Sequence, residues 1–249
     1  MIEPSKTWII SICFFLLAAC SAYAQQPAPA PELPPEESRG YLGVDFGAIR
    51  DHFGPLPAAT TGVGEINGEY AIYQGEPRQQ SPDIYLGGQV RLPTGTAQHA
   101  NEFAAFVGPM FHFTDRFTAG FHVQVRRINL PNSVYNDQTF IRKNMLLLEL
   151  PLVLNYKFGA DKDYFVEAQI VPEFHPHFSN SSSGPSPYPN PSLDHGYTLR
   201  GIVGRNFGSW YLRGAYETRF FKFSPTLGNP YNLYSWRSDT ATVGVGLSF

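Results

Sequence analysis

Residues 240–249 read TATVGVGLSF, and this stretch decides the fold class because its side chains alternate strictly. Every second residue is apolar, whereas the residues between are small or polar; the apolar set is Ala241, Val243, Val245, Leu247 and Phe249. Successive side chains of a β-strand point to opposite faces of a sheet. One face of this strand therefore suits lipid, and the other suits the crowded interior of a small barrel.

The same period of two recurs from Tyr41 onward, in segments that turn residues separate. Residues 144–158 place leucines and aromatic residues on one face, with Glu149, Asn155 and Lys157 on the other. The further alternating segments are 41–49, 103–113, 117–127, 164–175, 196–207 and 210–221. This pattern predicts an all-β fold, an antiparallel up-and-down transmembrane β-barrel of eight to ten strands.

The strand count depends on two more segments. Residues 83–92 alternate well, but adding only this strand gives nine and breaks the even count typical of bacterial barrels. Pairing it with a weaker strand at 65–73 (EINGEYAIY) gives ten. The alternative is eight strands, with both segments in a hairpin inside one long extracellular loop. We favour ten.

A soluble β-sandwich also alternates, so other features must separate the two fold classes. Aromatic residues cluster beside the short turns near 114–116, 159–163 and 208–209, as an interfacial aromatic girdle would. Short turns alternate with long connections at 129–142, 176–194 and 222–238, as periplasmic turns alternate with extracellular loops. The terminal Phe249 resembles the C-terminal assembly signal of outer-membrane barrels. Together these features favour a membrane barrel over residues 41–249.

The N-terminus predicts export. Lys6 precedes an apolar stretch too short to span a bilayer, and Ala22-Tyr23-Ala24 is a small-x-small cleavage site. We expect a signal peptide over residues 1–24, followed by a Pro-rich linker at 25–40. A lipid-anchored alternative remains open, because Cys20 follows Leu17-Ala18-Ala19.

The composition excludes several function classes. The formal net charge is −3, and no run of basic residues suggests nucleic acid. Both cysteines, Cys13 and Cys20, lie in the signal segment, so cleavage after Ala24 would leave no thiol for a disulfide, a metal site or a nucleophile. We expect no cofactor and no metal; the oligomeric state stays open.

The residues inferred to face the lumen carry both charges. They are Asp45, Glu149, Glu167, Glu173 and Glu217 against Arg91, Arg126, Lys157, Arg200, Arg213 and Arg219. Side chains fill the interior of a narrow barrel, and charges there must pair. A salt-bridge network that plugs the barrel is therefore the favoured interpretation. The alternative is a charged selectivity ring in a conducting pore.

Residues 144–175 resemble the central hairpin of the outer-membrane β-barrel domain family that includes PorT-like and OmpX-like proteins. The residues that carry this resemblance are Leu-Glu-Leu-Pro-Leu at 148–152, Tyr156-Lys157, and Tyr164-Phe165-Val166-Glu167-Ala168. Residues 197–221 and the terminal VGVGLSF also fit. The resemblance implies the fold and leaves the function open, because members of this family differ in role.

Residues 175–194 also resemble, locally, the His-x-Ser-Asn … Asn-Pro-Gly-x-x-Glu signature of PagL-type lipid A deacylases. That resemblance implies His177 as general base, Ser179 as nucleophile, Asp194 to orient the imidazole and Asn180 to help stabilise the oxyanion. This chain departs from the signature, since Ser192 replaces Gly and Asp194 replaces Glu, the loop is longer, and three strands follow it.

The expectation from the sequence is therefore a non-enzymatic barrel with a structural or surface-interaction role. Its expected partners are outer-membrane lipid and lipopolysaccharide, with a surface ligand at the extracellular loops. Lipid A deacylation and a small pore are the alternatives. A metal site of His175, His177 and His195 at the rim is weaker, because no carboxylate or Cys spacing supports it.

Overall fold

The computed structural model describes residues 39–54, 57–75, 81–95, 100–129, 134–135, 138–139, 143–180, 192–224 and 235–249. The expected signal peptide, most of the linker and the Cys20 alternative lie outside these residues. Every regular element within the described residues is a β-strand. No described segment forms a helix long and apolar enough to cross a membrane.

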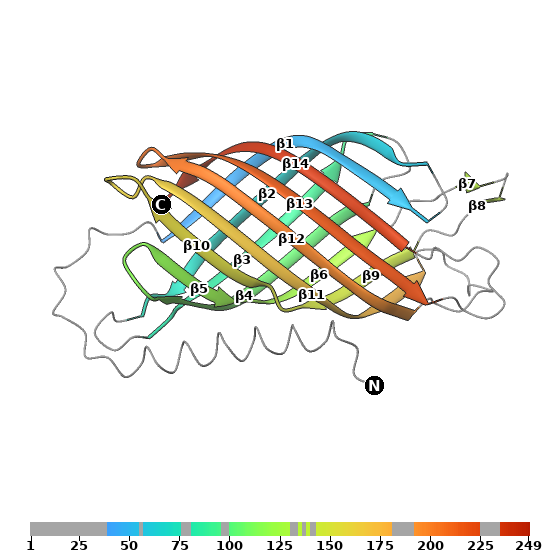
Figure 1. Cartoon of the computed structure of the whole chain (residues 1–249), viewed down its shortest axis with the longest axis horizontal. Helices are drawn as coiled ribbons and strands as arrows, with labels where there is room; N and C mark the ends of the chain where they lie inside the picture. The colour runs from blue at the N-terminus through green and yellow to red at the C-terminus, as the bar shows by residue number, and fades with distance from the viewer. Residues whose placement is uncertain are drawn as a thin grey trace.

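A single sheet contains twelve strands. They are β1 (Gly40–Phe53), β2 (Ala59–Tyr73), β3 (Asp83–Pro93), β4 (Asn101–His112), β5 (Phe117–Phe121), β6 (Val123–Asn129), β9 (Lys143–Glu149), β10 (Leu152–Phe158), β11 (Tyr164–Asn180), β12 (Ser192–Asn206), β13 (Trp210–Ser224) and β14 (Ser235–Ser248). A small separate pair, β7 (Val134–Tyr135) and β8 (Gln138–Thr139), lies beyond the barrel end (Figure 1).

Two of the crossings are each divided in the middle. β5 and β6 pair with β4 in one continuous register. β10 and the end of β9 likewise share one register with β11, which shifts at a bulge between Phe174 and His177. Pro151 causes the break between β9 and β10, because it has no N–H to give to the ladder. Its carbonyl still accepts a hydrogen bond from the His122 backbone N–H at 3.0 Å. The twelve strands therefore make ten crossings, and the favoured strand count is confirmed.

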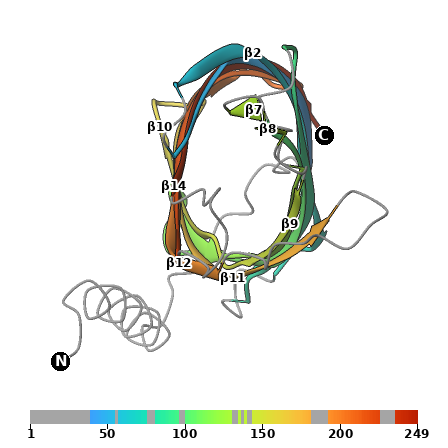
Figure 2. The same ribbon diagram turned by 90° about the vertical axis from the view of Figure 1, so that its right-hand side faces the viewer.

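The sheet closes on itself because β1 pairs with β14 from Tyr41↔Ser248 to Phe53↔Trp236. Each strand of the barrel is antiparallel to its neighbours, so the chain runs up and down around a ring (Figure 2). Closure removes the exposed sheet edges that would otherwise leave backbone groups unpaired in lipid. The segment expected at 65–73 is one of the crossings, not part of an extracellular hairpin.

The two barrel ends differ in their connections. The turns at 113–116, 159–163 and 207–209 are short and lie at the same end as the C-terminus (Figure 1). Gly159 (φ 93°) and Gly208 (φ 82°) have the left-handed backbone conformation that such turns require. The three longest connections, 130–142, 181–191 and 225–234, lie at the opposite end, and the connection 74–82 lies at the short-turn end. Short turns are typical of the periplasmic side of bacterial barrels, which predicts that the three longest connections face outward from the cell.

The expected loops at 176–194 and 222–238 were drawn too long. Residues 176–180 and 192–194 are strand, as are 222–224 and 235–238. The sequence pattern missed the continuations at 222–224 and 235–238 because Phe223 and Trp236 point inward there while Lys222 and Arg237 are exposed, which reverses the alternation expected of a lipid-facing strand. Backbone pairing, such as Asn180↔Lys143, continues regardless of side-chain polarity.

The outer wall carries the apolar side chains predicted for lipid contact. Val243, Val245 and Leu247 are 63%, 54% and 61% exposed, whereas their neighbours Thr240 and Thr242 are buried inside. Aromatic pairs stand beside the short turns, with Phe158 and Tyr164 5.4 Å apart and Phe207 and Trp210 4.2 Å apart. An apolar belt with aromatic rings at its border is the surface that a bilayer requires. The chain is therefore an outer-membrane type of β-barrel.

Candidate functional site

The lumen of the barrel is the candidate site, and it has three layers. The layer at the long-loop end is apolar and contains Phe53, Ala100, Ile128, Met145, Leu147, Phe221, Phe223 and Trp236. The Trp236 ring stacks between Phe53 and Phe221, with centroids 5.4 Å and 5.3 Å away. Its indole N–H donates to Asp51 Oδ1 at 3.2 Å, so the one polar atom of this side chain is satisfied.

The middle layer is a network of ion pairs that begins at Arg91. Arg91 Nη2 lies 3.0 Å from Glu65 Oε2, and Arg91 Nη1 lies 2.7 Å from Glu217 Oε1. Both contacts are buried, because Arg91 is only 1% exposed. A guanidinium group has a rigid fork of donors, which allows this one side chain to bridge two strands on opposite parts of the wall.

The same network continues through Glu102. This carboxylate accepts hydrogen bonds from Arg219 Nη1 at 2.7 Å and Arg126 Nη1 at 3.0 Å. Arg126 also contacts Glu149, which in turn accepts a hydrogen bond from Gln124. The last ion pair of the network joins Arg200 Nη2 to Glu65 Oε1, which are 2.5 Å apart. Four arginines therefore meet four glutamates, a balance that buried charges require.

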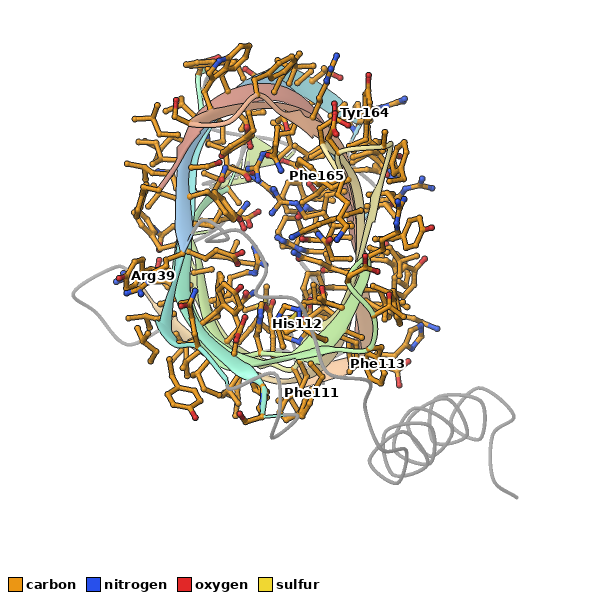
Figure 3. The ribbon with its side chains drawn as sticks, turned by 90° about the vertical axis from the view of Figure 1, so that its left-hand side faces the viewer. Arg39, Phe111, His112, Phe113, Tyr164 and Phe165 are labelled. Atoms are coloured by element: carbon orange, nitrogen blue, oxygen red, sulfur yellow. The ribbon has the colours of Figure 1, made fainter. Side chains whose placement is uncertain are left out.

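The third layer is open. A cavity of about 210 Å³ lies between the ion-pair network and the short-turn end. Figure 3 looks into this end, where His112 and Phe165 point into the barrel. We call this cavity the vestibule. At its wall, Arg213 Nη2 lies 2.6 Å from Asp45 Oδ2, and Asn67 donates to the same carboxylate at 2.8 Å.

The lumen-facing residues expected from the sequence occupy the interior. Arg91, Arg126, Arg213 and Arg219 are buried there with Asp45, Glu149, Glu173 and Glu217, while Lys157, Glu167 and Arg200 line the vestibule. The preferred interpretation of a cross-strand salt-bridge network is confirmed for the five arginines, which pair with Asp45, Glu149, Glu217 and two further glutamates. Glu173 instead accepts a hydrogen bond from Thr198, and Glu167 accepts hydrogen bonds from Asn155 and Gln169.

Sequence reasoning missed two members of the network, Glu65 and Glu102. Glu65 lies on the segment assigned as a weak strand, and its alternation with Asn67 and Glu69 was the available signal. Glu102 precedes the expected start of its strand by one residue. Each therefore stood at the edge of a segment, where the period of two is least informative.

The residues of the deacylase hypothesis lie on two strands. His177, Ser179 and Asn180 belong to β11, where the register places them opposite Leu146, Asn144 and Lys143. Their side chains lie outside the described residues, so the hypothesis stays a prediction.

Asp194, the fourth residue of that hypothesis, belongs to β12 and is exposed. Its carboxylate contacts the ring of His195 at 3.2 Å and Lys222 Nζ at 3.9 Å. Within the described part of the chain, no three His, Cys, Asp or Glu side chains gather in a metal-ligating group. His195 is described, whereas the side chains of His175 and His177 are not.

Comparison with known proteins gives likeness of architecture only. No family model matches the chain, and no curated protein matches it. The solved structures that are similar include the outer-membrane protease OmpT from Escherichia coli, with 9% identity, 88% of this chain and 99% of that chain covered, and a TM-score of 0.49. Neisserial surface protein A is also similar, with 10% identity, coverage of 86% and 100%, and a TM-score of 0.40. A third is Ail of Yersinia pestis, with 8% identity, coverage of 86% and 99%, and a TM-score of 0.30.

These structures are outer-membrane β-barrels, and none of the comparisons links the chain to the PorT-like and OmpX-like family itself.

Proposed function

We propose that this chain is a non-conducting and non-enzymatic outer-membrane barrel, which strengthens the membrane and contacts other surface molecules through its long loops. The observation that supports this proposal is the ion-pair network across the lumen, with Arg91, Glu102 and Arg219 each 1% exposed. Buried side chains that already pair with one another favour a filled lumen over a hydrated path.

The network argues against a pore on physical grounds. A permeating ion needs a polar path whose groups exchange contacts with it quickly. Here the guanidinium and carboxylate groups already satisfy one another, and separating them would leave buried charges unpaired. The apolar layer around Trp236 lies in series with the network, and the carboxylate beside it, Asp51, already accepts a hydrogen bond from the Trp236 indole N–H.

The arrangement of the connections supports a role at the cell surface. The three longest connections, 130–142, 181–191 and 225–234, lie at the end away from the C-terminus, whereas the other end has three turns of three to five residues and the connection 74–82. Loops tolerate change in sequence and carry function when a rigid scaffold holds them. A filled barrel is such a scaffold, because its interior fixes the wall.

Planar-bilayer recording tests the non-conducting part. We expect no discrete conductance steps from the purified, inserted barrel. A double variant, Arg91→Ser with Trp236→Ala, removes one large side chain from each filled layer and is expected to raise the leak current if it inserts. Discrete steps from the unmodified protein would overturn this part of the proposal.

A lipid A mass profile tests the non-enzymatic part. We expect outer membranes with and without the expressed protein to give the same profile. Ser179→Ala is the control. Loss of one acyl chain that depends on Ser179 would instead make lipid A deacylation the function, with His177 as base, Asp194 orienting it and Asn180 at the oxyanion.

Cell sedimentation tests the surface contact. We expect cells that express the barrel to aggregate and settle faster than cells without it. Replacing residues 181–191 and 225–234 by Gly-Ser segments of equal length should abolish the difference while the barrel still inserts. Settling that is unchanged by expression would reject contact between neighbouring cells as the role.

A further inference from the structure

The vestibule is independent of the proposed surface role, because it lies at the opposite end of the barrel from the long loops. Aromatic side chains from four strands line it: Tyr41, Tyr85, Phe106 and Phe165. The Phe106 ring stacks on the imidazole of His122 with 4.5 Å between centroids. A concave pocket with aromatic walls and a few polar groups has the form of a small-molecule site.

The charges on the vestibule wall are largely compensated. Arg126, Arg200 and Arg213 each contact a carboxylate, at 3.0, 2.5 and 2.6 Å. Glu167 accepts hydrogen bonds from Gln169 at 2.6 Å and from Asn155 at 3.3 Å. The wall therefore offers no strong excess of either sign, and a charged ligand would gain little from entering it.

Glu69, the other carboxylate on the wall, lies within electrostatic range of Glu167, which repels it, and of Arg213, which attracts it. Lys157 lines the same cavity, so the two carboxylates Glu69 and Glu167 are matched in number by the cations Arg213 and Lys157.

Neutral hydrogen-bonding groups at the same wall are less well satisfied. Asn67 Oδ1, Gln89 Nε2 and His122 Nε2 are buried, and none has a hydrogen-bond partner within the described residues. Their side chains line the vestibule from β2, from β3 and from the junction between β5 and β6. Amide and imidazole groups supply both donors and acceptors, and buried polar groups of this kind ordinarily have partners.

We propose that the vestibule binds an uncharged, hydroxyl-rich small molecule of sugar size that enters from the periplasmic end. The aromatic walls suit the apolar face of a sugar ring, and the amide and imidazole groups suit its hydroxyls, each of which donates and accepts. A free sugar and the end of a neutral periplasmic glycan carry the same chemistry, so the test must separate these two sources.

Saturation-transfer NMR on the folded, full barrel is the test. The protein is held in an amine-oxide detergent, because alkyl glycosides would compete for the site. The probes are trehalose as the free sugar, a neutral glucan of about ten units as the chain end, and citrate and spermidine as charged controls. We expect transfer to trehalose, to the glucan or to both, and none to the charged probes.

Matched variants locate the site. Gln89→Met removes the inward amide, and Val90→Met changes the adjacent outward-facing residue of the same strand. We expect Gln89→Met to weaken sugar binding about five-fold, as loss of one hydrogen bond would, and Val90→Met to leave it unchanged. His122→Phe keeps the stack on Phe106 and removes the ring nitrogens, so it is the second variant if Gln89→Met folds poorly. Circular dichroism confirms that each variant is folded.

Three results would overturn the proposal. They are no transfer to either neutral probe from the folded protein, transfer to a charged probe alone, and equal affinities in the inward and outward variants. The conductance and cell-sedimentation experiments would be unaffected by any of these results.

Discussion

The same strands enclose both halves of the lumen, but side chains fill the half at the long-loop end and leave a cavity in the half at the short-turn end. Along the β1–β14 pair, Gly43 lies opposite Gly246 near the short-turn end, and Phe53 lies opposite Trp236 near the long-loop end. The Tyr211 ring occupies the space above the two glycines, where a Cβ on Gly43 would lie 1.9 Å from the Tyr211 hydroxyl. At the other end, stacked rings fill the interior.

This difference teaches that the strand pattern and the filling of a barrel are separate properties. The period of two directs a side chain inward, but its volume and charge decide whether the lumen is packed or open. One sequence can thus combine a layer filled with side chains and an open cavity in the same barrel.

The largest expected difference between the vestibule and the apolar layer is the access of their side chains to water. Asn155→Cys places a thiol in the vestibule, and Leu147→Cys places one in the apolar layer of the same crossing. We expect a water-soluble maleimide to label the first in the folded barrel and the second only after unfolding, because the reactive thiolate needs solvent. Residues 25–249 contain no other cysteine. Equal labelling of both sites, measured by mass spectrometry, would mean that the two halves do not differ.

The ion-pair layer should show a large effect on stability. Arg91→Leu leaves Glu65 and Glu217 with one fewer buried partner each, and we expect the free energy of unfolding to fall by about 3–5 kcal/mol. Arg237→Leu is the control, because Arg237 is exposed and solvent screens its pair with Asp239, so we expect little change in stability. Urea unfolding of the two variants in lipid vesicles makes the comparison. Similar losses would show that burial does not strengthen these pairs.

Truncating an aromatic ring should lower the free energy of unfolding more in the apolar layer than at the vestibule. Phe221→Ala creates a cavity in the apolar layer, and we expect a loss of about 3–5 kcal/mol. Phe165→Ala removes a ring that already borders the vestibule, so the expected loss is less than half of that. The same unfolding measurement applies. A larger loss at Phe165 would indicate that the vestibule is packed as tightly as the apolar layer.

The smallest effect on stability is expected for an ion pair outside the membrane. Lys162 Nζ lies 2.8 Å from Asp115 Oδ2, and this hydrogen bond lowers the pKa of the Asp115 carboxyl. Because the folded pKa lies below the unfolded one, the pair stabilises at neutral pH, and its contribution is lost as the pH falls through the folded pKa. Asp115→Asn should lower the urea midpoint slightly at pH 7 and not at all in strong acid. A gap that widened with acid would contradict this sign.

The outward direction of the lipid-facing residues and the positions of most strands could be predicted from the sequence alone. Val243, Val245 and Leu247 could be placed outward because alternation is a local property of an extended backbone. Glu149, Glu217 and Arg219 could be placed inward by the same argument. The alternation argument did not predict the strand ends at 176–180 and 235–238, because the pattern of their side chains does not separate strand from loop.

Which charged side chains form ion pairs, and where the lumen is open, depends on the three-dimensional arrangement of the strands. Arg91 contacts Glu217 across 126 residues of sequence, and Arg200 contacts Glu65 across 135. Such pairs arise from the register of each strand and the closure of β1 on β14, which no local pattern encodes. The vestibule has the same origin, because its walls come from residues distributed over the whole chain. Alternation is decided between neighbours in sequence, whereas pairing and cavities are decided between neighbours in space.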